Sequence, residues 1–271
     1  MKILYRKMKA TLDNYLINYN DMGSDVAQPI IFIHGFPFSW RMWYKQEEYF
    51  CENYRTITYD IRGHGDSSMG EPQFMVEYFV DDFFRLVNFL NIKKAVVVGL
   101  SMGGYIALRA YEKKPDIFRA LVLCDTKSEA DTNDAKIKRA NQAQQVKIDG
   151  AKKFSEEFVK NVFAKQSFTT LKGEVEMIKE IISKTETLSI AATLIALAAR
   201  TDTTHVLPTI DIPTLILVGE HDTITPVANS QAMKEKIPNA EMKIIPNAAH
   251  MSNLENADVF NSTIENFLKK L

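Results

Sequence analysis

Cysteine is scarce in this chain of 271 residues, which contains only Cys51 and Cys124. The two lie far apart in the sequence and beside apolar residues, so we expect both to be buried thiols. They indicate no disulfide framework, and this composition fits a reducing compartment, the cytoplasm. The first seven residues carry charge but no apolar segment follows them, so we expect no signal peptide.

Long runs of one charge and long apolar runs are also missing. The formal net charge is −1 at pH 7, and no strongly basic stretch resembles the surface of a nucleic-acid-binding protein. The longest apolar stretch, residues 188–199, is too short to cross a bilayer and includes Ser189 and Thr193. We therefore expect no nucleic acid partner and no membrane span.

Motifs for metal and phosphate binding are absent as well. The sequence has no HExxH, no CxxC and no glycine-rich phosphate loop with a lysine, and its histidines and carboxylates do not cluster at the spacing of metal ligands. We therefore expect chemistry that uses neither a cofactor nor a metal ion.

Apolar runs typical of buried strands alternate with segments whose apolar residues recur at helical spacing. This alternation predicts an α/β fold with a mostly parallel sheet, helices on both faces and active residues at the carboxyl ends of the strands. Residues 126–206 interrupt it, because they predict several helices and no clear strand. We expect a core domain of residues 1–125 and 207–271 with a helical cap insertion at 126–206. The predicted strands are two short ones within 2–20, then 29–33, 55–59, 95–98, 119–124, 214–219 and 241–245, and the predicted helices of the core include 75–91, 105–111, 227–237 and 255–271.

The stretch from Gly99 to Gly104 joins a predicted strand to a predicted helix and contains the pattern G-x-S-x-G. A turn this tight strains the backbone of Ser101 and leaves no room for side chains two positions to either side, where Gly99 and Gly103 stand. The pattern predicts Ser101 as a nucleophile at the carboxyl edge of the sheet. The N–H of Met102, at the start of the helix, is placed to stabilise negative charge that develops there.

A serine hydroxyl needs a general base, and the chain has only five histidines. His250, just after the last predicted strand, is the strongest candidate, because it completes the chain order Ser, Asp, His with Ser101 and Asp222. Asp222 follows a predicted buried strand and is our choice for the acid that orients the base. Glu220 and Asp125 are the alternatives, and we expect Asp125 instead to anchor the entry into the cap.

A second donor to the developing oxyanion should come from the loop after the strand at 29–33. The backbone N–H of Phe36 is the best placed, because Pro37 has none, and Gly35 allows the backbone to approach the reacting centre closely. His34 and His64 lie in loops near the same edge, and we expect structural roles for both.

Taken together, these segments resemble the α/β-hydrolase superfamily over nearly the whole chain except the predicted cap. The resemblance implies the α/β-hydrolase fold, with a mostly parallel eight-stranded sheet, helices on both faces and a helical cap. It also implies that Ser101 is the nucleophile, His250 the base and Asp222 the acid, with the oxyanion bound by the N–H groups of Phe36 and Met102. The segments that carry it are HGFP at 34–37, DIRGHGDS at 60–67, GLSMGG at 99–104, GEHD at 219–222 and His250.

Within the superfamily, the chain is similar to the branch of carboxylesterases, 3-oxoadipate enol-lactonases and cofactor-free haloperoxidases or perhydrolases. Serine at position 101 departs from epoxide hydrolases and haloalkane dehalogenases, which have aspartate there. We expect a carboxylesterase that acts with water on small-molecule esters of short to medium acyl chains. A lactone hydrolase or perhydrolase is the alternative enzyme, and a non-catalytic small-molecule receptor on the same fold is the alternative of another class. The sequence does not determine the oligomeric state.

The predicted cap offers two groups of residues for substrate binding. Leu188, Ala191, Ala192, Ile195 and Ala199 recur at helical spacing, and we expect Ala192 and Ile195 to contact the acyl chain unless the stripe packs against other cap helices. A lactone with a free carboxylate would need a cation facing the pocket. The candidates are Lys138, Arg139 and Arg200, although we expect these three to lie on the solvated surface.

Overall fold

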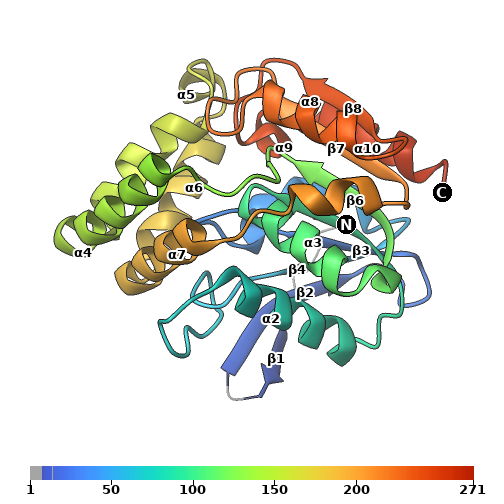
Figure 1. Cartoon of the computed structure of the whole chain (residues 1–271), viewed down its shortest axis with the longest axis horizontal. Coiled ribbons are helices and arrows are strands. Elements are labelled where there is room, and N and C mark those ends of the chain that lie inside the picture. Colours follow the sequence, from blue (N-terminus) through green and yellow to red (C-terminus); the bar gives the residue numbers. More distant parts are fainter. Residues whose placement is uncertain (1–7, 14) are drawn as a thin grey trace.

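The computed structural model describes residues 8–13 and 15–271 and has an eight-stranded sheet at its centre (Figure 1). The strand order is β1-β2-β4-β3-β5-β6-β7-β8. β2 pairs antiparallel with β1 and β4, and all other neighbouring strands are parallel, so the predicted sheet is confirmed. The strands are β1 Met8–Leu12, β2 Tyr15–Met22, β3 Pro29–Ile33, β4 Arg55–Tyr59, β5 Ala95–Leu100, β6 Phe118–Cys124, β7 Thr214–Gly219 and β8 Glu241–Ile245.

The central strands are almost wholly apolar because helices cover both of their faces. All six residues of β5 and all six of β7 are buried. The parallel register aligns Leu100 at the end of β5 with Cys124 at the end of β6, and Ile33 at the end of β3 with Gly99. The loops that follow these strands therefore emerge together at one edge of the sheet.

Two pairs of helices cover the sheet: α2 packs against α3, and α1 packs against α10. The helix predicted at 255–271 corresponds to α10, which begins at Ala257 because the Asn256 side chain accepts the Val259 N–H and caps it there. The core helices are α1 Tyr44–Phe50, α2 Val76–Phe89, α3 Met102–Lys113, α8 Val227–Lys236, α9 Ser252–Glu255 and α10 Ala257–Leu268, with 3₁₀ turns η1 Trp40–Trp43 and η2 Pro115–Ile117.

Residues 126–206 form helices and contain no strand, as the sequence predicts. Helices α4, α5, α6 and α7 lie together at one end of the molecule (Figure 1), where α4 packs against both α6 and α7, whereas η3 returns to the core and packs against α8. Gly150 interrupts α4 with a φ of +83°, so the helix has two limbs. The boundary between a core domain and a cap domain stays a prediction. The elements are α4 Asn133–Val162, α5 Ser167–Thr170, α6 Lys172–Lys184, α7 Thr187–Ala199 and η3 Thr204–Thr209.

Two further expectations concern cysteine and the membrane. Cys124 is buried, whereas Cys51 is only half-buried because it ends α1 at the surface, so the prediction was wrong for Cys51. In the described part of the chain, no single helix is long and apolar enough to cross a membrane. The pair α6 and α7, bent by 96° relative to each other, has the length and composition of a span only when the two helices are taken together.

The buried carboxyl group of Glu47, which lies between α1 and β4, leads to a prediction about the pH dependence of stability. Glu47 on α1 is fully buried and accepts a hydrogen bond from Thr58 Oγ1 at 3.0 Å, and burial raises the pKa of Glu47 to about 8. The folded protein therefore holds a proton that the unfolded chain releases above its ordinary pKa of 4.5. Stability should fall as pH rises from about 4.5 to about 8 and change little above that range.

Glu47→Gln removes this ionisation while keeping the shape of the side chain. We expect the variant to melt about 5 °C or more above the wild type at pH 8.5, and the difference to shrink at pH 5. Thermal denaturation at both pH values measures it, with the exposed Glu52→Gln as control. An equal shift at both pH values would show that Glu47 is not the titrating group.

Candidate active site

The turn at Ser101 has the geometry of a strained strand-to-helix corner. Ser101 has φ +54° and ψ −114° between the end of β5 and the first residue of α3. A Cβ atom on Gly99 would stand within 3.0 Å of the Gly103 carbonyl, and one on Gly103 would stand equally close to the Ile33 carbonyl. Both glycines are therefore required sterically, as the sequence indicates.

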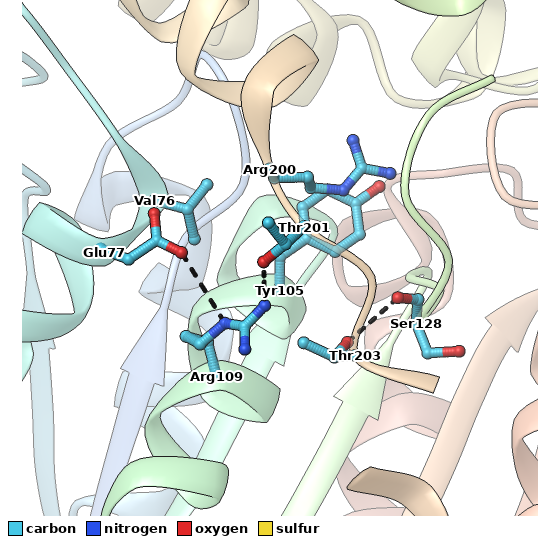
Figure 2. A pocket seen from close by; sticks show the side chains of 8 residues that line it. All are labelled: Val76, Glu77, Tyr105, Arg109, Ser128, Arg200, Thr201 and Thr203. Carbon is cyan, nitrogen blue, oxygen red and sulfur yellow. Dashed lines mark hydrogen bonds and ion pairs between the residues drawn. The ribbon is translucent and has the colours of Figure 1, made fainter. Parts of the chain in front are cut away.

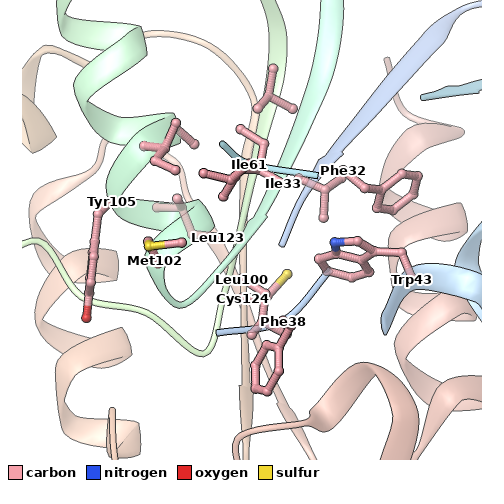
Figure 3. Close-up of a cluster of buried hydrophobic side chains, with 14 of the residues drawn as sticks. Phe32, Ile33, Phe38, Trp43, Ile61, Leu100, Met102, Tyr105, Leu123 and Cys124 are labelled. Carbon is pink, nitrogen blue, oxygen red and sulfur yellow. The ribbon is translucent and has the colours of Figure 1, made fainter. Parts of the chain in front are cut away.

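Apolar side chains surround the inner side of this turn, including Leu100, Met102 and Cys124 (Figure 3). The backbone of Ser101 is held from two sides: its N–H donates to the Cys124 carbonyl at 2.9 Å, and its carbonyl accepts from Thr126 Oγ1 at 2.8 Å. Both partners belong to β6 and the loop that follows it, so the turn is anchored to the neighbouring strand.

The loop after β3 lies directly against the serine. A Cβ atom on Gly35 would stand 3.2 Å from the Cβ of Ser101, so only glycine allows this approach without displacement. Phe36 follows in this loop and is buried, with a cis peptide bond to Pro37. The loop that carries the Phe36 N–H and the helix start that carries the Met102 N–H thus both lie next to Ser101.

His250 and Asp222 form a buried hydrogen-bonded pair. Nδ1 of His250 lies 2.8 Å from Oδ2 of Asp222. The other carboxylate oxygen accepts the N–H groups of Ile224 at 2.8 Å and Thr225 at 3.0 Å, and Thr225 Oγ1 donates to Oδ2 at 2.7 Å. The hydrogen bond to the carboxylate requires a proton on Nδ1, so the lone pair of the neutral imidazole is on Nε2. Sequence reasoning missed Thr225, whose place three residues after an aspartate is typical of a side chain-capped turn.

The electrostatics of this pair favour an ion pair on protonation. Burial alone would raise the pKa of Asp222, but the positive charge of His250 and the hydrogen bonds to the carboxylate outweigh it and hold that pKa below its usual value. Burial alone would lower the pKa of His250, but the Asp222 charge outweighs it and raises that pKa above 6.5. The carboxylate therefore stabilises the imidazolium.

Among the described residues, neither alternative acid is hydrogen-bonded to His250, although the charge of Asp125 also contributes to the raised pKa of His250. Asp125 accepts the Gly219 N–H at 2.8 Å and the Ser252 hydroxyl, and burial raises its pKa well above the usual value. It therefore joins the end of β6, where the predicted cap begins, to β7 and α9, and this agrees with the expectation that Asp125 anchors the entry into the cap. Glu220 is half-exposed and accepts the Asn247 N–H at 3.0 Å.

His34 and His64 hold the loops around the site as neutral side chains. His34 donates from Nδ1 to the Gly35 carbonyl at 2.8 Å and accepts the Ile61 N–H at Nε2 at 2.9 Å. Burial lowers the pKa of His34 to about 3 and that of His64 to about 4. The geometry agrees with the structural roles expected for both.

Two aromatic residues of α4 cover the loop after β3, and sequence reasoning did not identify them. Phe154 and Phe158 stack with ring centroids 5.3 Å apart, and their centroids lie 6.3 and 5.8 Å from that of Phe36. Their spacing of four residues was the available signal, since it places both rings on one helix face.

Ala192 and Ile195 lie on a groove that the site residues do not line. Together with Leu188 and Ala191 they line an open groove of about 770 Å³, opposite the segment around Phe74. Neither Ser101, Asp222 nor His250 belongs to its lining. Ile195 is half-exposed, at 47%. The role of these two residues as substrate contacts stays a prediction.

The arginines considered for a substrate carboxylate are already paired. Arg200 is only 5% exposed, donates to Asp131 at 2.8 Å and lies 4.1 Å over the Tyr105 ring (Figure 2). Arg139 also pairs with Asp131, whereas Lys138 is exposed. The expectation of a solvated surface was therefore wrong for Arg200, which links the end of α7 to the segment before α4.

The family model, the curated relatives and the solved structures that match this chain agree with one another. The α/β hydrolase fold family matches residues 28–257. The chain is 27% identical to 3-oxoadipate enol-lactonase 2 of Acinetobacter baylyi, with 100% of this chain and 99% of that protein covered. It is 30% identical to a putative non-heme chloroperoxidase of Synechocystis, with 96% of each covered. A solved structure of a thermophilic esterase from Thermogutta terrifontis, with malate bound, has a TM-score of 0.92 and 32% identity over 98% of each chain.

The match to most of the chain agrees with the sheet order, the strained serine turn after β5 and the helices inserted after β6. The chain belongs to the α/β hydrolase fold family.

Proposed function

We propose that this protein is a serine hydrolase that cleaves carboxylic esters of short to medium acyl chains through an acyl-enzyme intermediate. The observation that carries the proposal is the buried hydrogen bond of 2.8 Å between His250 and Asp222, at the sheet edge where Ser101 occupies its strained turn. The esterase and enol-lactonase among the relatives support hydrolysis of a carboxylic ester bond.

In the first half of the reaction, Ser101 Oγ attacks the acyl carbonyl while Nε2 of His250 takes its proton. Asp222 stabilises the resulting imidazolium, and the N–H groups of Phe36 and Met102 bind the oxyanion. The imidazolium then gives its proton to the departing alkoxide, which leaves as the alcohol. In the second half, His250 activates a water molecule that attacks the acyl-enzyme and releases the acid.

Two of the three cations considered for a substrate carboxylate are already paired, which favours a neutral ester over a carboxylated lactone. Arg200 and Arg139 already pair with Asp131. A substrate carboxylate would have to compete with Asp131 for both. An enol-lactone with a free carboxylate is therefore the weaker candidate for this chain, although one relative bears that name.

A panel of p-nitrophenyl esters from acetate to palmitate, with uncharged lactones and a carboxylated enol-lactone alongside, tests the proposal. We expect the highest kcat/KM on esters of short to medium chains and little turnover of the palmitate ester or of a long-chain triglyceride added to the panel. A higher kcat/KM on the carboxylated lactone than on any ester would contradict it. A receptor would release every ester unchanged.

The pH dependence of kcat/KM provides a separate prediction. His250 must be neutral to accept the serine proton, and the Asp222 charge holds its pKa above 6.5. Activity should therefore rise with pH through one ionisation whose midpoint lies above 6.5 in the free enzyme. Measurement of kcat/KM from pH 5 to 9 on a p-nitrophenyl ester checks this, and a midpoint well below 6 would contradict the pairing.

A further inference from the structure

Within the part of the chain that the structure describes, two hydroxyl groups on the inner face of α7 have no hydrogen-bond partner. Ser189 and Thr193 are one helical turn apart and 1% and 0% exposed, and within the described residues neither hydroxyl oxygen is bonded. Other buried hydroxyls of the same helical segment, those of Ser155 and Thr185, donate to backbone carbonyls of the preceding turn. Native proteins usually supply a partner to buried polar atoms, so this pair calls for a partner from outside the chain.

The face that carries these hydroxyls points toward the catalytic edge. Ser189 Oγ is 2.9 Å from the position that a Cβ atom on Gly63 would occupy, so the first turn of α7 lies against the loop after β4. At the other end, Arg200 lies over Tyr105 (Figure 2), on the helix that begins directly after Ser101. Thr193 lies between these two contacts along the helix.

A third unpartnered atom belongs to the loop that Ser189 contacts. His64 is 1% exposed, and its Nδ1 donates to the Arg62 carbonyl at 3.1 Å, so Nε2 carries the lone pair and has no partner in the described chain. The ring of His64 lies against that of Phe36, with centroids 6.3 Å apart. Its Nε2 is therefore a hydrogen-bond acceptor beside the loop proposed to bind the oxyanion.

We infer that Ser189, Thr193 and His64 form a polar subsite that binds an uncharged hydrogen-bond donor of the substrate, a hydroxyl group, next to the reacting carbonyl. The inference rests on the proposed ester hydrolysis and names the substrate class as small hydroxylated esters. Nε2 of neutral His64 can only accept a hydrogen bond, whereas the hydroxyls of Ser189 and Thr193 both donate and accept. A substrate hydroxyl satisfies all three groups, whereas a carboxylate would face the His64 lone pair without a cation among them.

The test compares matched esters with and without the hydroxyl. For the wild type, we expect kcat/KM on at least one enantiomer of ethyl 3-hydroxybutyrate to exceed that on ethyl butyrate by about tenfold or more. Propyl butyrate and 3-hydroxypropyl butyrate form the corresponding pair for the alcohol side. A preference in either pair supports the subsite and assigns the hydroxyl to the acyl or the alcohol part. A ratio near one in both pairs would overturn it and indicate that the three groups bind ordered water only.

Substitutions then connect the preference to these residues. Thr193→Val and Ser189→Ala should bring the ratio of kcat/KM on the hydroxylated ester to kcat/KM on the plain ester close to one. Thr193→Ser keeps the hydroxyl and should retain the preference, so it remains informative even if Thr193→Val folds poorly. Thr185→Val is the matched control, because it removes a buried hydroxyl that is bonded to the backbone, and it should leave the ratio unchanged. A ratio unaffected by Thr193→Val and Ser189→Ala would overturn the assignment.

Binding separates this inference from the proposed function. Calorimetry on Ser101→Ala should show tighter binding of the hydroxylated ester than of its plain partner. If Ser101→Ala binds the hydroxylated ester more tightly but the wild type hydrolyses neither ester, ester hydrolysis is refuted and the subsite is kept. Turnover by the wild type with equal binding of both esters would refute the subsite alone.

Discussion

Ser101→Ala is expected to lower kcat for p-nitrophenyl butyrate by about a millionfold, since removal of the nucleophile from a serine triad eliminates most of the catalysis. The fold should persist, because the backbone of Ser101 makes the contacts that hold the turn. Its N–H donates to Cys124 and its carbonyl accepts from Thr126, and alanine retains both interactions.

The measurement is the rate of ester cleavage by purified protein whose circular dichroism and melting temperature match those of the wild type. Ser262→Ala on α10 is a suitable control, because its hydroxyl donates to a carbonyl of its own helix at 3.2 Å. Esterase activity that survives in folded Ser101→Ala would refute the assignment of the nucleophile.

Asp222→Asn is expected to lower kcat/KM by about 10⁴-fold. The asparagine amide would donate toward Nδ1 of His250 and favour the tautomer with its proton on Nε2, which cannot accept the serine proton. The substitution also removes the negative charge that raises the pKa of His250, so the midpoint of any residual pH profile should fall. A purely structural role for Asp222 would not move that midpoint.

Asp125→Asn and Glu220→Gln are the comparisons that identify the acid. Asp125 accepts hydrogen bonds from Gly219 and Ser252, so its replacement should lower the melting temperature. The variant that remains folded should keep most of its kcat/KM. Glu220 is half-exposed, and its replacement should change little. The choice of acid is wrong if the Asp125 variant, measured well below its melting temperature, loses more activity than Asp222→Asn.

Local sterics and chain order made much of this site predictable from the sequence. Gly99 and Gly103 are required by the backbone clash at one tight turn, and that clash depends only on residues near Ser101 and on the neighbouring strand. Apolar runs determine buried parallel strands, and parallel strands bring their carboxyl ends to one edge. Asp222 and His250 follow such strands, so their convergence could be inferred from the pattern alone.

The partner of each buried polar group could not be predicted in this way. The carboxylates of Asp125 and Asp222 both follow strands of the sheet, so their position after a strand does not by itself determine the partner of each. Only the path of the chain after β8, which brings Ser252 to Asp125 and His250 to Asp222, assigns their partners.

The orientation of α7 was likewise decided by the tertiary structure. Apolar spacing predicted a face with Ala192 and Ile195, which lies along an outer groove, whereas the inner face carries Ser189 and Thr193. An alanine-rich helix presents apolar surface on several sides, so its hydrophobic pattern does not determine its rotation. Packing against α4, the contact of Ser189 with the Gly63 loop and the stacking of Arg200 on Tyr105 determine that rotation, because these contacts join residues far apart in the sequence.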